Sequence, residues 1–501
     1  MHLLFVVAIC SVIFLWLNHR WNDRKVIQLA AKVGAHKLQV LMGFGPIVTP
    51  ATLMKTYIND CQKLGHNFVS YVGPYSHFVT SDPESIKDIL TSKTTRHKSK
   101  LAYKGLRHAL GQGIVTMPDK EWQSHRKLMD VAFKISKIVE FLPIFHKKMP
   151  RLFEELDKCH VMENSYDVLV HCREFTMSIT GETMLGRDSD KTTVNVKHYA
   201  QLITSILEYV SEIMFKTTYQ FKYFVKLADI TLFRKQRKIL HFLDSIINEA
   251  YKYYSNEIQN DIEYLDHQDI AVAKYLNKAI ESNILERELA ISSMKHLFGA
   301  SFETTSTTLY LTILMLAMHP EYQEKTYAEI SQLFPDNDGG EFKMTYEHIT
   351  QLTYLDMFIK ETMRLFPTIP MIGRIAIGGD IRLSNGLVIP EGPEIMINIY
   401  NLHRNKNIWG PEADTFNPDN FLPSNVEKRH AYAFIPFAKG MRNCIGMRYA
   451  ELSLRVAMAK IIKRYKFSTT ANPEDLVLHN RIALHLANHP PLTIVKRKQL
   501  S

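Results

Sequence analysis

Apolar side chains recur every three to four residues through most of the middle of the chain, which predicts a mainly helical body. This spacing continues with few breakers from about residue 122 to residue 318. The longest such segment is ELAISSMKHLFGASFETTSTTLYLTILMLAMHP, and Pro320 ends it while suiting the first turn of the next helix. A further helix, YEHITQLTYLDMFIKETMRLF, is expected to stop before Pro367, and a last helix is expected from about Cys444 to Tyr465.

Short strands are expected on either side of this helical region. The runs FVSYV and HFVTS are bounded by Gly65, Gly73 and Pro74, and IRLSNGLVIPEG has the turn residues of paired short strands. A loop is expected at PDNDGG, between two helices. Strands and helices do not alternate, so the pattern predicts a mainly α fold with small β-sheets.

The N-terminal segment LLFVVAICSVIFLWL, from Leu3 to Leu17, is apolar apart from one serine and lies at the short end of what spans a bilayer. Arg20, Arg24 and Lys25 follow it, so the charge rule places the rest of the chain in the cytosol. A cleaved secretory signal is the alternative, but no basic segment precedes the run and no small-x-small site follows it. We expect a transmembrane anchor helix at residues 1–20, a linker at 21–45 and a single catalytic domain at 46–501.

Composition narrows the class of partner. The 61 Lys and Arg residues against 51 Asp and Glu give a net charge of +10, which suits anionic lipid, nucleic acid or an acidic protein. The basic residues are spread along the chain and no Cys/His finger spacing occurs, so nucleic acid is not expected. Five cysteines argue against a disulfide framework and for a reducing compartment.

The most specific chemical signal is the segment from Phe437 to Gly446. A thiolate that binds haem iron needs a tight turn and a close approach of the backbone, which Gly440 and Gly446 supply around Cys444. A buried cysteine between two unrelated glycines is the alternative. With Phe437 to pack on the macrocycle and Arg442 to reach a propionate, the segment resembles the haem-binding loop of the cytochrome P450 family. The resemblance implies the cytochrome P450 fold, with Cys444 as the axial iron ligand.

Two distant segments extend the resemblance. Glu361 and Arg364 match the family's Glu-x-x-Arg, whose spacing puts acid and base on one helical face. The coil from Phe416 to Phe421 resembles the family's Phe-x-Pro-Glu-Arg-Phe, but Asn420 stands where that arginine often does. We therefore expect an amide to hydrogen-bond to the pair in place of a charge.

Residues Gly299 to Thr305 resemble the family's oxygen-activating segment. Glu303 offers a carboxylate and Thr304 a hydroxyl for moving protons toward oxygen, although threonine in a helix also commonly bonds to a backbone carbonyl. Ser301 replaces the glycine usual in the family, so a tighter groove is expected. Ala300 stands where many fatty-acid ω-hydroxylases carry a glutamate that attaches to haem, so non-covalent haem is expected.

The resemblance also implies which residues hold the haem and which partner supplies it with electrons. Trp122 and Arg126 match the family's Trp-x-x-x-Arg helix, and with Arg374 and Arg442 they would meet the haem propionates. The chain has no GxGxxG or GxxxxGK[ST] loop, so electrons must come from elsewhere. The implied donor is NADPH–cytochrome P450 reductase, with cytochrome b5 as a further partner. The reductase would dock on a basic face around Lys439, Arg442 and Arg448, or these residues, except for Arg442, form an ordinary solvated surface.

The expected function is a monooxygenase that inserts one atom of O2 into an apolar substrate at haem b, on the cytosolic face of the endoplasmic reticulum membrane. The animal microsomal branch that includes fatty-acid ω-hydroxylases (clan 4) is the most similar. Residues 101–116 and 369–372 would line the pocket for a fatty acid, a hormone or terpenoid, or a foreign compound. The alternatives are a reductase-independent haem-thiolate isomerase or dehydratase and a haem-bound sensor or carrier.

Overall fold

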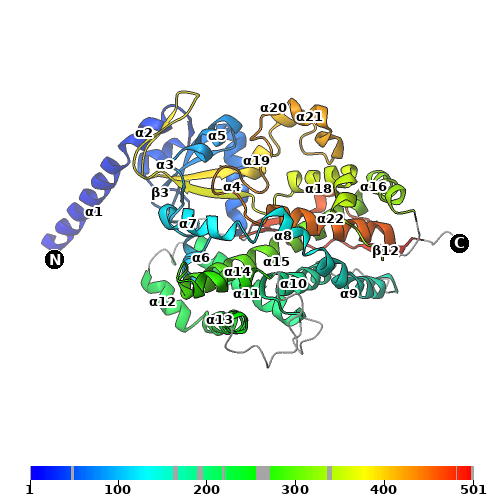
Figure 1. The fold of residues 1–501 in the computed structure, drawn as a ribbon. Coiled ribbons are helices and arrows are strands. Elements are labelled where there is room, and N and C mark those ends of the chain that lie inside the picture. The colour runs from blue at the N-terminus through cyan, green and yellow to red at the C-terminus, as the bar shows by residue number, and fades with distance from the viewer. Residues whose placement is uncertain are drawn as a thin grey trace.

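The computed structural model of the chain describes residues 2–46, 50–161, 168–188, 196–216, 219, 222–255, 271–335, 341–480 and 482–497. Helices dominate it, and Figure 1 shows a large helical body beside a lobe that holds the main sheet. The fold is therefore mainly helical with small sheets, as the sequence predicts. Of the PDNDGG loop, only Pro335 lies within the described residues.

The helices of the N-terminal half are α1 (His2–Asn22), α2 (Arg24–Ala30), α3 (Lys37–Met42), α4 (Pro50–Leu64), α5 (Pro83–Thr91), α6 (Lys104–Leu110), α7 (Asp119–Met129), α8 (Ile135–Val139), α9 (Leu142–Val161), α10 (Val168–Leu185), α11 (Val196–Phe215), α12 (Lys222–Ile230) and α13 (Arg234–Tyr254). Those that follow are α14 (Val272–Glu281), α15 (Arg287–Met318), α16 (Pro320–Leu333), α17 (Tyr346–Gln351), α18 (Thr353–Leu365), α19 (Ile399–Leu402), α20 (Lys406–Trp409), α21 (Pro423–Glu427) and α22 (Met447–Arg464).

The main sheet joins segments from both halves of the chain. In the part of the chain that the structure describes, its order is β1 (Gly34–Ala35), β2 (Asn67–Val72), β3 (Tyr75–Thr80), β8 (Glu394–Asn398), β5 (Met371–Ile375) and β4 (His97–Lys98). The predicted strands FVSYV and HFVTS are β2 and β3, and they pair antiparallel around the turn at Gly73. At the other edge β4 pairs antiparallel with β5, which sets Lys98 opposite Arg374.

Smaller strand pairs lie outside the main sheet. The predicted hairpin IRLSNGLVIPEG is confirmed as β6 (Ile381–Arg382) paired antiparallel with β7 (Val388–Ile389). Near the C-terminus, β9 (Tyr465–Ser468) pairs with β12 (Thr493–Lys496), and β10 (Leu478–Asn480) pairs with β11 (Leu484–Leu486).

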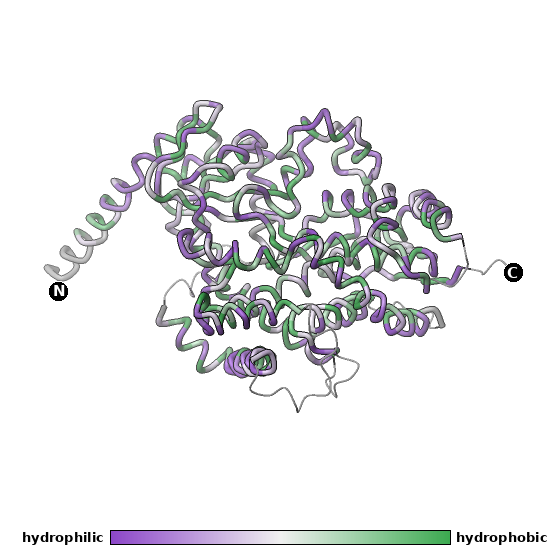
Figure 2. Tube along the Cα trace, viewed as in Figure 1, coloured by the Kyte–Doolittle hydropathy of each residue, from purple (hydrophilic) through white to green (hydrophobic). Residues whose placement is uncertain are grey.

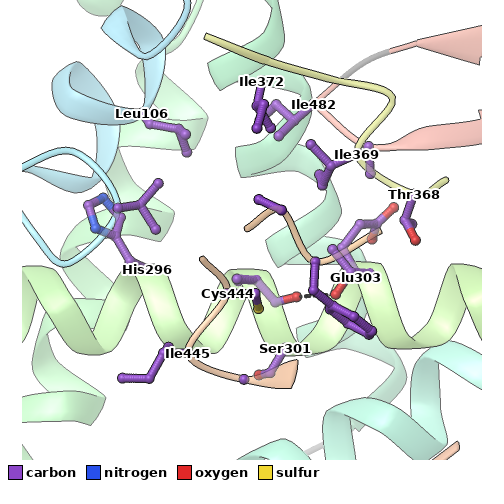
Figure 3. A pocket seen from close by; sticks show the side chains of 18 of the residues that line it. Leu106, His296, Ser301, Glu303, Thr368, Ile369, Ile372, Cys444, Ile445 and Ile482 are labelled. Carbon is purple, nitrogen blue, oxygen red and sulfur yellow. Dashed lines mark hydrogen bonds between the residues drawn. The ribbon is translucent and has the colours of Figure 1, made fainter. Parts of the chain in front are cut away.

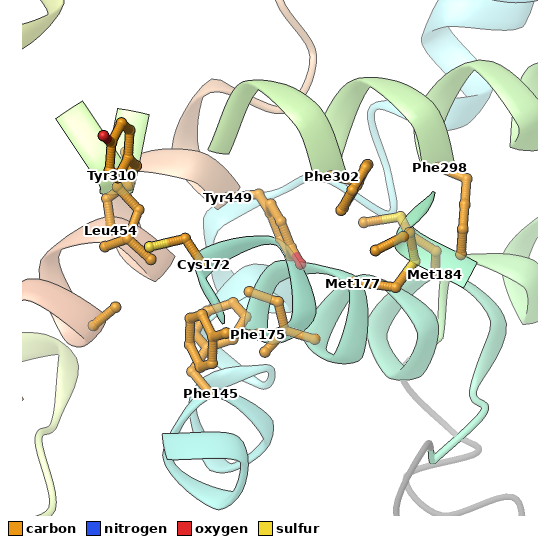
Figure 4. Close-up of a cluster of buried hydrophobic side chains, with 14 of the residues drawn as sticks. Phe145, Cys172, Phe175, Met177, Met184, Phe298, Phe302, Tyr310, Tyr449 and Leu454 are labelled. Atoms are coloured by element: carbon orange, nitrogen blue, oxygen red, sulfur yellow. The ribbon is translucent and has the colours of Figure 1, made fainter. Parts of the chain in front are cut away.

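The long helix α15 forms the centre of the helical body. It spans 32 residues and is buried on nearly every side, which is why its sequence is apolar all round rather than on one stripe. Figure 4 shows Tyr310 of this helix beside Leu454 of α22, and Phe298 and Phe302 beside Met184 of α10. Pro320 begins α16 after α15 ends at Met318, so the predicted boundary is confirmed.

Two predicted helix boundaries are wrong. The helix expected before Pro367 is two helices, α17 and α18, which are separated at Leu352. The carboxylate of Glu329 in α16 accepts hydrogen bonds from the amides of Tyr354 (2.6 Å) and Leu355 (2.9 Å), so a separate helix start is stabilised there. The last helix begins at Met447 rather than near Cys444, because the cysteine belongs to a loop.

The segment expected to anchor the chain is helical. Helix α1 covers it, and the indole of Trp16 donates to the carbonyl of Met42 at 3.1 Å, at the end of α3. The side chains of residues 2–9 and 12 lie outside the description. Within the described residues, no helix combines the length and hydrophobicity needed to cross a bilayer.

Candidate functional site

A cavity of about 380 Å³ lies between α15 and the loop that precedes α22. Apolar side chains dominate its walls: Leu106 and Leu110 come from α6, Ile369 and Ile372 follow α18, and Ile482 comes from the C-terminal region. Figure 3 shows Leu106, Ile369, Ile372 and Ile482 around an open centre, with Cys444 and Glu303 contributed by different segments of the chain. A volume in this range with few polar groups is typical of a site for a small apolar molecule.

Cys444 is presented to this cavity by a tight loop. Its amide donates to the carbonyl of Phe437 at 2.9 Å, which closes the loop, and both Ala438 (φ 56°) and Gly440 (φ 76°) have left-handed backbone. A Cβ at Gly440 would lie 2.3 Å from the carbonyl oxygen of Leu90. Glycine is therefore needed here both for the conformation and for the close approach to the last turn of α5.

The thiol of Cys444 is reached from the cavity and lies deep below the outer surface. Burial raises its pKa, whereas a hydrogen bond from the backbone of Gly446 and the charges of Arg126 and Lys98 act in the opposite direction. These groups favour the thiolate, which is the form that binds a metal.

Cationic side chains gather beside Cys444. Arg442 donates to the carbonyls of Arg96 (3.0 Å) and Met117 (2.7 Å), and its guanidinium lies 4.2 Å from the ring centre of Trp122. Burial, with the charge of Arg374 adding to it, lowers the pKa of Arg442 to about 10. Arg126 instead donates to the carbonyl (2.8 Å) and side chain (3.1 Å) of Asn443.

The cation cluster contains a member that the sequence does not identify, Lys98 of β4. Its ammonium lies 3.4 Å from the hydroxyl of Tyr103, and burial together with Arg374 and Arg442 lowers its pKa well below the usual range. Among the described residues, Nη1 of Arg442 and Nη2 of Arg374 are buried without a hydrogen-bond partner. A dianionic group beside Cys444 would complete this set of donors.

Across the cavity, Glu303 and Thr304 lie on adjacent positions of α15 and both line the wall. The hydroxyl of Thr304 donates to the carbonyl of Ala300 at 2.7 Å, which is the local bond that threonine commonly makes in a helix. One oxygen of Glu303 accepts from Arg173 of α10 at 3.0 Å, and the other is buried without a partner among the described residues. Ser301 donates to the carbonyl of Phe298 at 3.2 Å and to the hydroxyl of Thr180 at 3.3 Å.

Glu361 and Arg364 form a fully buried pair outside the cavity. Nε and Nη2 of Arg364 each lie 2.7 Å from a different oxygen of Glu361. Asn420 donates its side-chain amide to Glu361 at 3.1 Å, as the sequence predicts. The sequence analysis missed Arg429, whose guanidinium lies 4.2 Å from the ring centre of Trp409 and interacts electrostatically with Glu361. Arg429 therefore brings a positive charge to the Glu361–Arg364 pair from a position outside the coil motif.

The predicted pocket segments both reach the cavity. Residues 101–116 contribute Leu106 and Ile114, and residues 369–372 contribute all four of their side chains. Of the predicted haem-binding residues, Gly440 shapes the loop and Arg374 lies behind Gly373, so neither is among the lining residues. The sequence analysis missed several lining residues, among them Lys98, Arg173 and His296, because no motif marks them.

Comparison with known proteins agrees with this site. A sequence profile described as cytochrome P450 matches residues 38–497. The chain belongs to the cytochrome P450 family. "Probable cytochrome P450 313a4" of Drosophila melanogaster is 33% identical over 97% of this chain and 98% of its own length. "Probable cytochrome P450 4ac2" of the same organism is 28% identical over 99% of this chain and 94% of its own length.

Cytochromes P450 are in general haem-thiolate monooxygenases that use O2, and the residues present here fit that group. Cys444 is a candidate ligand at the cavity, and Arg442 and Arg374 keep unused buried donors beside it. The small side chains of Ala300 and Gly446 leave room between α15 and the cysteine loop. When bound, the haem would supply the iron at which oxygen is activated, with electron density from the thiolate.

One expectation about the cytochrome P450 surface is wrong. Lys439, Arg442 and Arg448 cluster in sequence, but Arg442 is buried at 6% exposure and belongs to the cation cluster inside. Lys439 is partly exposed, and its ammonium donates to the carbonyl of Ala431, while Arg448 is exposed. A basic face around the cysteine loop therefore has two of the three predicted cations.

Proposed function

We propose that this chain is a haem b monooxygenase that inserts one oxygen atom of O2 into an apolar substrate, with electrons from NADPH–cytochrome P450 reductase. The observation that carries the proposal is that Cys444, Glu303 and Thr304 all line one apolar cavity. Oxygen cleavage requires both a strong electron donor at the iron and a route for protons.

The chain's own groups have distinct tasks in this proposal. Arg442, Arg374 and Lys98 would hold the haem carboxylates, and Phe437 would pack beside the porphyrin. Thr304 holds a hydroxyl at the cavity wall, and Glu303, fixed by Arg173, supplies protons to it. The apolar walls exclude water and bind the substrate. Ala300 at the α15 wall supports a non-covalent haem because it has no group that can form an ester.

The acid and hydroxyl on α15 favour a monooxygenase over an isomerase that needs no reductase. A haem-thiolate isomerase has little use for a proton route toward oxygen. Product formation from a hydroperoxide in the absence of NADPH would instead support the isomerase.

The experiment that tests the proposal is the carbon monoxide spectrum of the reduced protein. The wild-type chain is expected to show the red-shifted Soret band of a thiolate ligand, and Cys444→Ser is expected to lose it. An unshifted wild-type band would overturn the proposal. Thr304→Ala is expected to bind substrate normally while diverting NADPH-derived electrons into peroxide, measured as the ratio of product to NADPH consumed.

We also propose that the protein is bound to the endoplasmic reticulum membrane with its catalytic part in the cytosol. Two exposed apolar surfaces support this: the α12 region, with Tyr223 at 85% and Ile230 at 73% exposure, and α3, with Leu38 at 70%. Both lie on the side of the molecule from which α1 projects (Figure 1). Figure 2 shows green, hydrophobic positions along α12 at that edge. Exposed apolar surface of this kind is typical of contact with lipid.

A further inference from the structure

Helix α1 continues into α2 without a break in its backbone hydrogen bonds. Asp23 is the one residue between them: its amide donates to the carbonyl of His19 at 3.0 Å, and its carbonyl accepts from the amide of Ile27 at 2.9 Å. These are the bonds of a regular α-helix, and residues 23–45 contain no proline that would interrupt them. The two helices therefore form one nearly continuous helix, which Figure 1 shows projecting from the lobe with α2 at its base.

The α2 part of this helix is embedded in the lobe that holds the main sheet. Val26, Leu29 and Ala30 are buried in the apolar cluster that also contains side chains of β2, β3 and β8. On the exposed side of α2, the ammonium of Lys25 lies 3.0 Å from a carboxylate oxygen of Asp380, just before β6. Because a protein core is close-packed, burial of α2 fixes the direction in which α1 leaves the lobe.

A second set of bonds joins the side of α1 to the end of α3. The last carbonyls of a helix have no partner within that helix. At the end of α3, the carbonyl of Met42 accepts from Nε1 of Trp16 at 3.1 Å, and the carbonyl of Gly43 accepts from Nε2 of His19 at 3.0 Å. Side chains of α1 therefore supply donors that the end of α3 lacks.

Gly43 permits the close approach of the two helices. Its backbone is left-handed (φ 65°), and a Cβ there would lie 2.9 Å from Nη1 of Arg20 and 3.1 Å from Cδ2 of His19. An alanine would be strained at this φ and would crowd both side chains. Glycine therefore suits the packing of α1 on α3.

Asp23 joins the junction of α1 and α2 to the main sheet. Its Oδ2 accepts from the hydroxyl of Tyr71 in β2 at 3.0 Å, and Tyr71 is fully buried. The same oxygen lies 3.7 Å from Nη1 of Arg20 and 3.7 Å from Nε2 of His19. Burial, with the charge of Asp23 adding to it, raises the pKa of Tyr71 to about 12, so the phenol keeps its proton at neutral pH and continues to donate.

Apolar side chains of both bonded helices are exposed. They include Leu17 and Trp21 of α1 and Leu38 of α3. The guanidinium of Arg24 lies 4.9 Å from the ring centre of Trp21. Tryptophan beside a basic residue is typical of the boundary between lipid headgroups and acyl chains. A phospholipid surface is therefore the partner that suits these groups.

We propose that α1, α2 and the sheet lobe form one rigid unit, and that this unit fixes the angle at which the catalytic part lies on a phospholipid bilayer. The inference rests on the membrane localisation proposed above. Residues 21–45 then transmit the orientation of α1 to the lobe, and the cavity keeps a constant orientation toward the lipid.

The test measures the distance between α1 and the lobe in the haem-loaded full chain. Nitroxide labels are attached through a ketone-bearing amino acid introduced at Leu15 of α1 and at Lys87 of α5, which are both exposed, so the natural cysteines stay unlabelled. Double electron–electron resonance is expected to give one narrow distance distribution, and the same distance in phospholipid vesicles and in detergent.

Trp16→Phe combined with His19→Phe removes both bonds to α3 and keeps large aromatic side chains. The population of a second, undocked distance is expected to rise about 10-fold for each hydrogen bond lost. Gly43→Ala is an independent variant that is expected to act in the same direction. Trp21→Phe is the matched control, because Trp21 is exposed and its indole has no hydrogen bond among the described residues.

The orientation of the catalytic part is read from the linear dichroism of the haem Soret band on oriented bilayers. The wild-type chain and Trp21→Phe are expected to show the same haem tilt, and the Trp16→Phe, His19→Phe chain is expected to lose most of the dichroism. Each variant is first checked for the thiolate band with carbon monoxide, which shows that the fold around Cys444 is intact.

The outcomes separate the two proposals. A wild-type chain that binds vesicles with a broad distance distribution overturns the rigid unit alone, as does a double variant that keeps the wild-type distance and dichroism. A narrow wild-type distance in detergent, in a chain that does not bind vesicles, overturns the membrane localisation.

Discussion

At the scale of single residues, Lys98 shows how strand pairing brings a charge to the cofactor site. The lysine is separated from Arg374 by most of the chain, and the register of β4 with β5 sets them opposite each other. Burial beside two arginines disfavours its charged form, so the position is costly without a counter-anion. A haem carboxylate would supply that anion.

Lys98→Met is therefore expected to speed the loss of haem by about 10-fold, the effect of one charge-assisted hydrogen bond. The measurement is the rate of haem transfer to excess apomyoglobin, followed by absorbance. Lys100→Met is the control, because Lys100 is exposed two residues further on. Equal rates for both variants would show that Lys98 does not hold the haem.

A second prediction at the scale of single residues concerns the stabilising role of Asn420. Asn420→Ala is expected to lower the free energy of unfolding by about 1–2 kcal/mol, because a buried carboxylate loses a donor. Urea denaturation followed by the Soret band measures this change. Asn425→Ala is the comparison: it removes a bond of 2.8 Å to the carbonyl of Asp419, a neutral acceptor, and is expected to cost less. A larger loss for Asn425→Ala would contradict the assigned role.

At the scale of elements, α6 is tied to α11 and α12 over the cavity. Asp229, just before the end of α12, accepts from His108 of α6 at 2.8 Å and from Tyr209 of α11 at 2.5 Å. Leu106 and Leu110 on α6 form the cavity wall beneath these bonds. One carboxylate on α12 therefore links α6 and α11 above the cavity.

Asp229→Ala is expected to raise the rates of substrate entry and exit about 10-fold, because losing the shared acceptor favours local opening by roughly 1–2 kcal/mol. Stopped-flow mixing with 2-dodecanone, followed at the Soret band, measures both rates. Asp414→Ala provides the control, since Asp414 is exposed and forms an ion pair with Arg404 at 3.4 Å that lies outside α6, α11 and α12. If the two variants exchange substrate at the same rate, local opening of α6 does not control substrate entry and exit.

Local patterns in the sequence predict the elements that depend on near neighbours. The apolar run of α15 and the turn between β2 and β3 lie within short segments, and the sequence places both. The break at Leu352 could not be predicted, because the carboxylate that stabilises it comes from Glu329 in another helix.

In the candidate site, too, the sequence predicts residues that lie in local motifs and misses those whose partners are distant in the chain. Cys444, Glu303 and Thr304 stand in recognisable motifs, and the structure places all three at one cavity. Lys98 and Arg429 have no motif, since their partners lie in distant segments and meet only in the fold. In the sequence His296 is an ordinary polar residue of a helix, and it is distinguished only by its burial and by the lack of a hydrogen-bond partner among the described residues.

At the scale of the whole molecule, exposed apolar groups on α3 and α12 lie on the side from which α1 projects. Removing residues 2–22 is expected to weaken membrane binding without abolishing it, because these surfaces remain. Sedimentation with microsomes, in the absence and presence of high salt, measures the bound fraction. Serine replacements at Leu227, Ile230 and Leu232 in the shortened chain are then expected to release it. A shortened chain that never sediments would show that α1 alone holds the membrane.

The loop around Cys444 rests on the carbonyls of Leu90 and Arg96, through Gly440 and Arg442. The iron ligand thus takes its position from residues that the ribosome makes several hundred codons earlier. A nascent chain that stops before this loop already contains α15 and Lys98 but lacks the Cys444 thiol at the cavity. If Cys444 is the ligand, as proposed, haem binding is expected only once synthesis is nearly complete, and products truncated before the loop are expected to lack the prosthetic group.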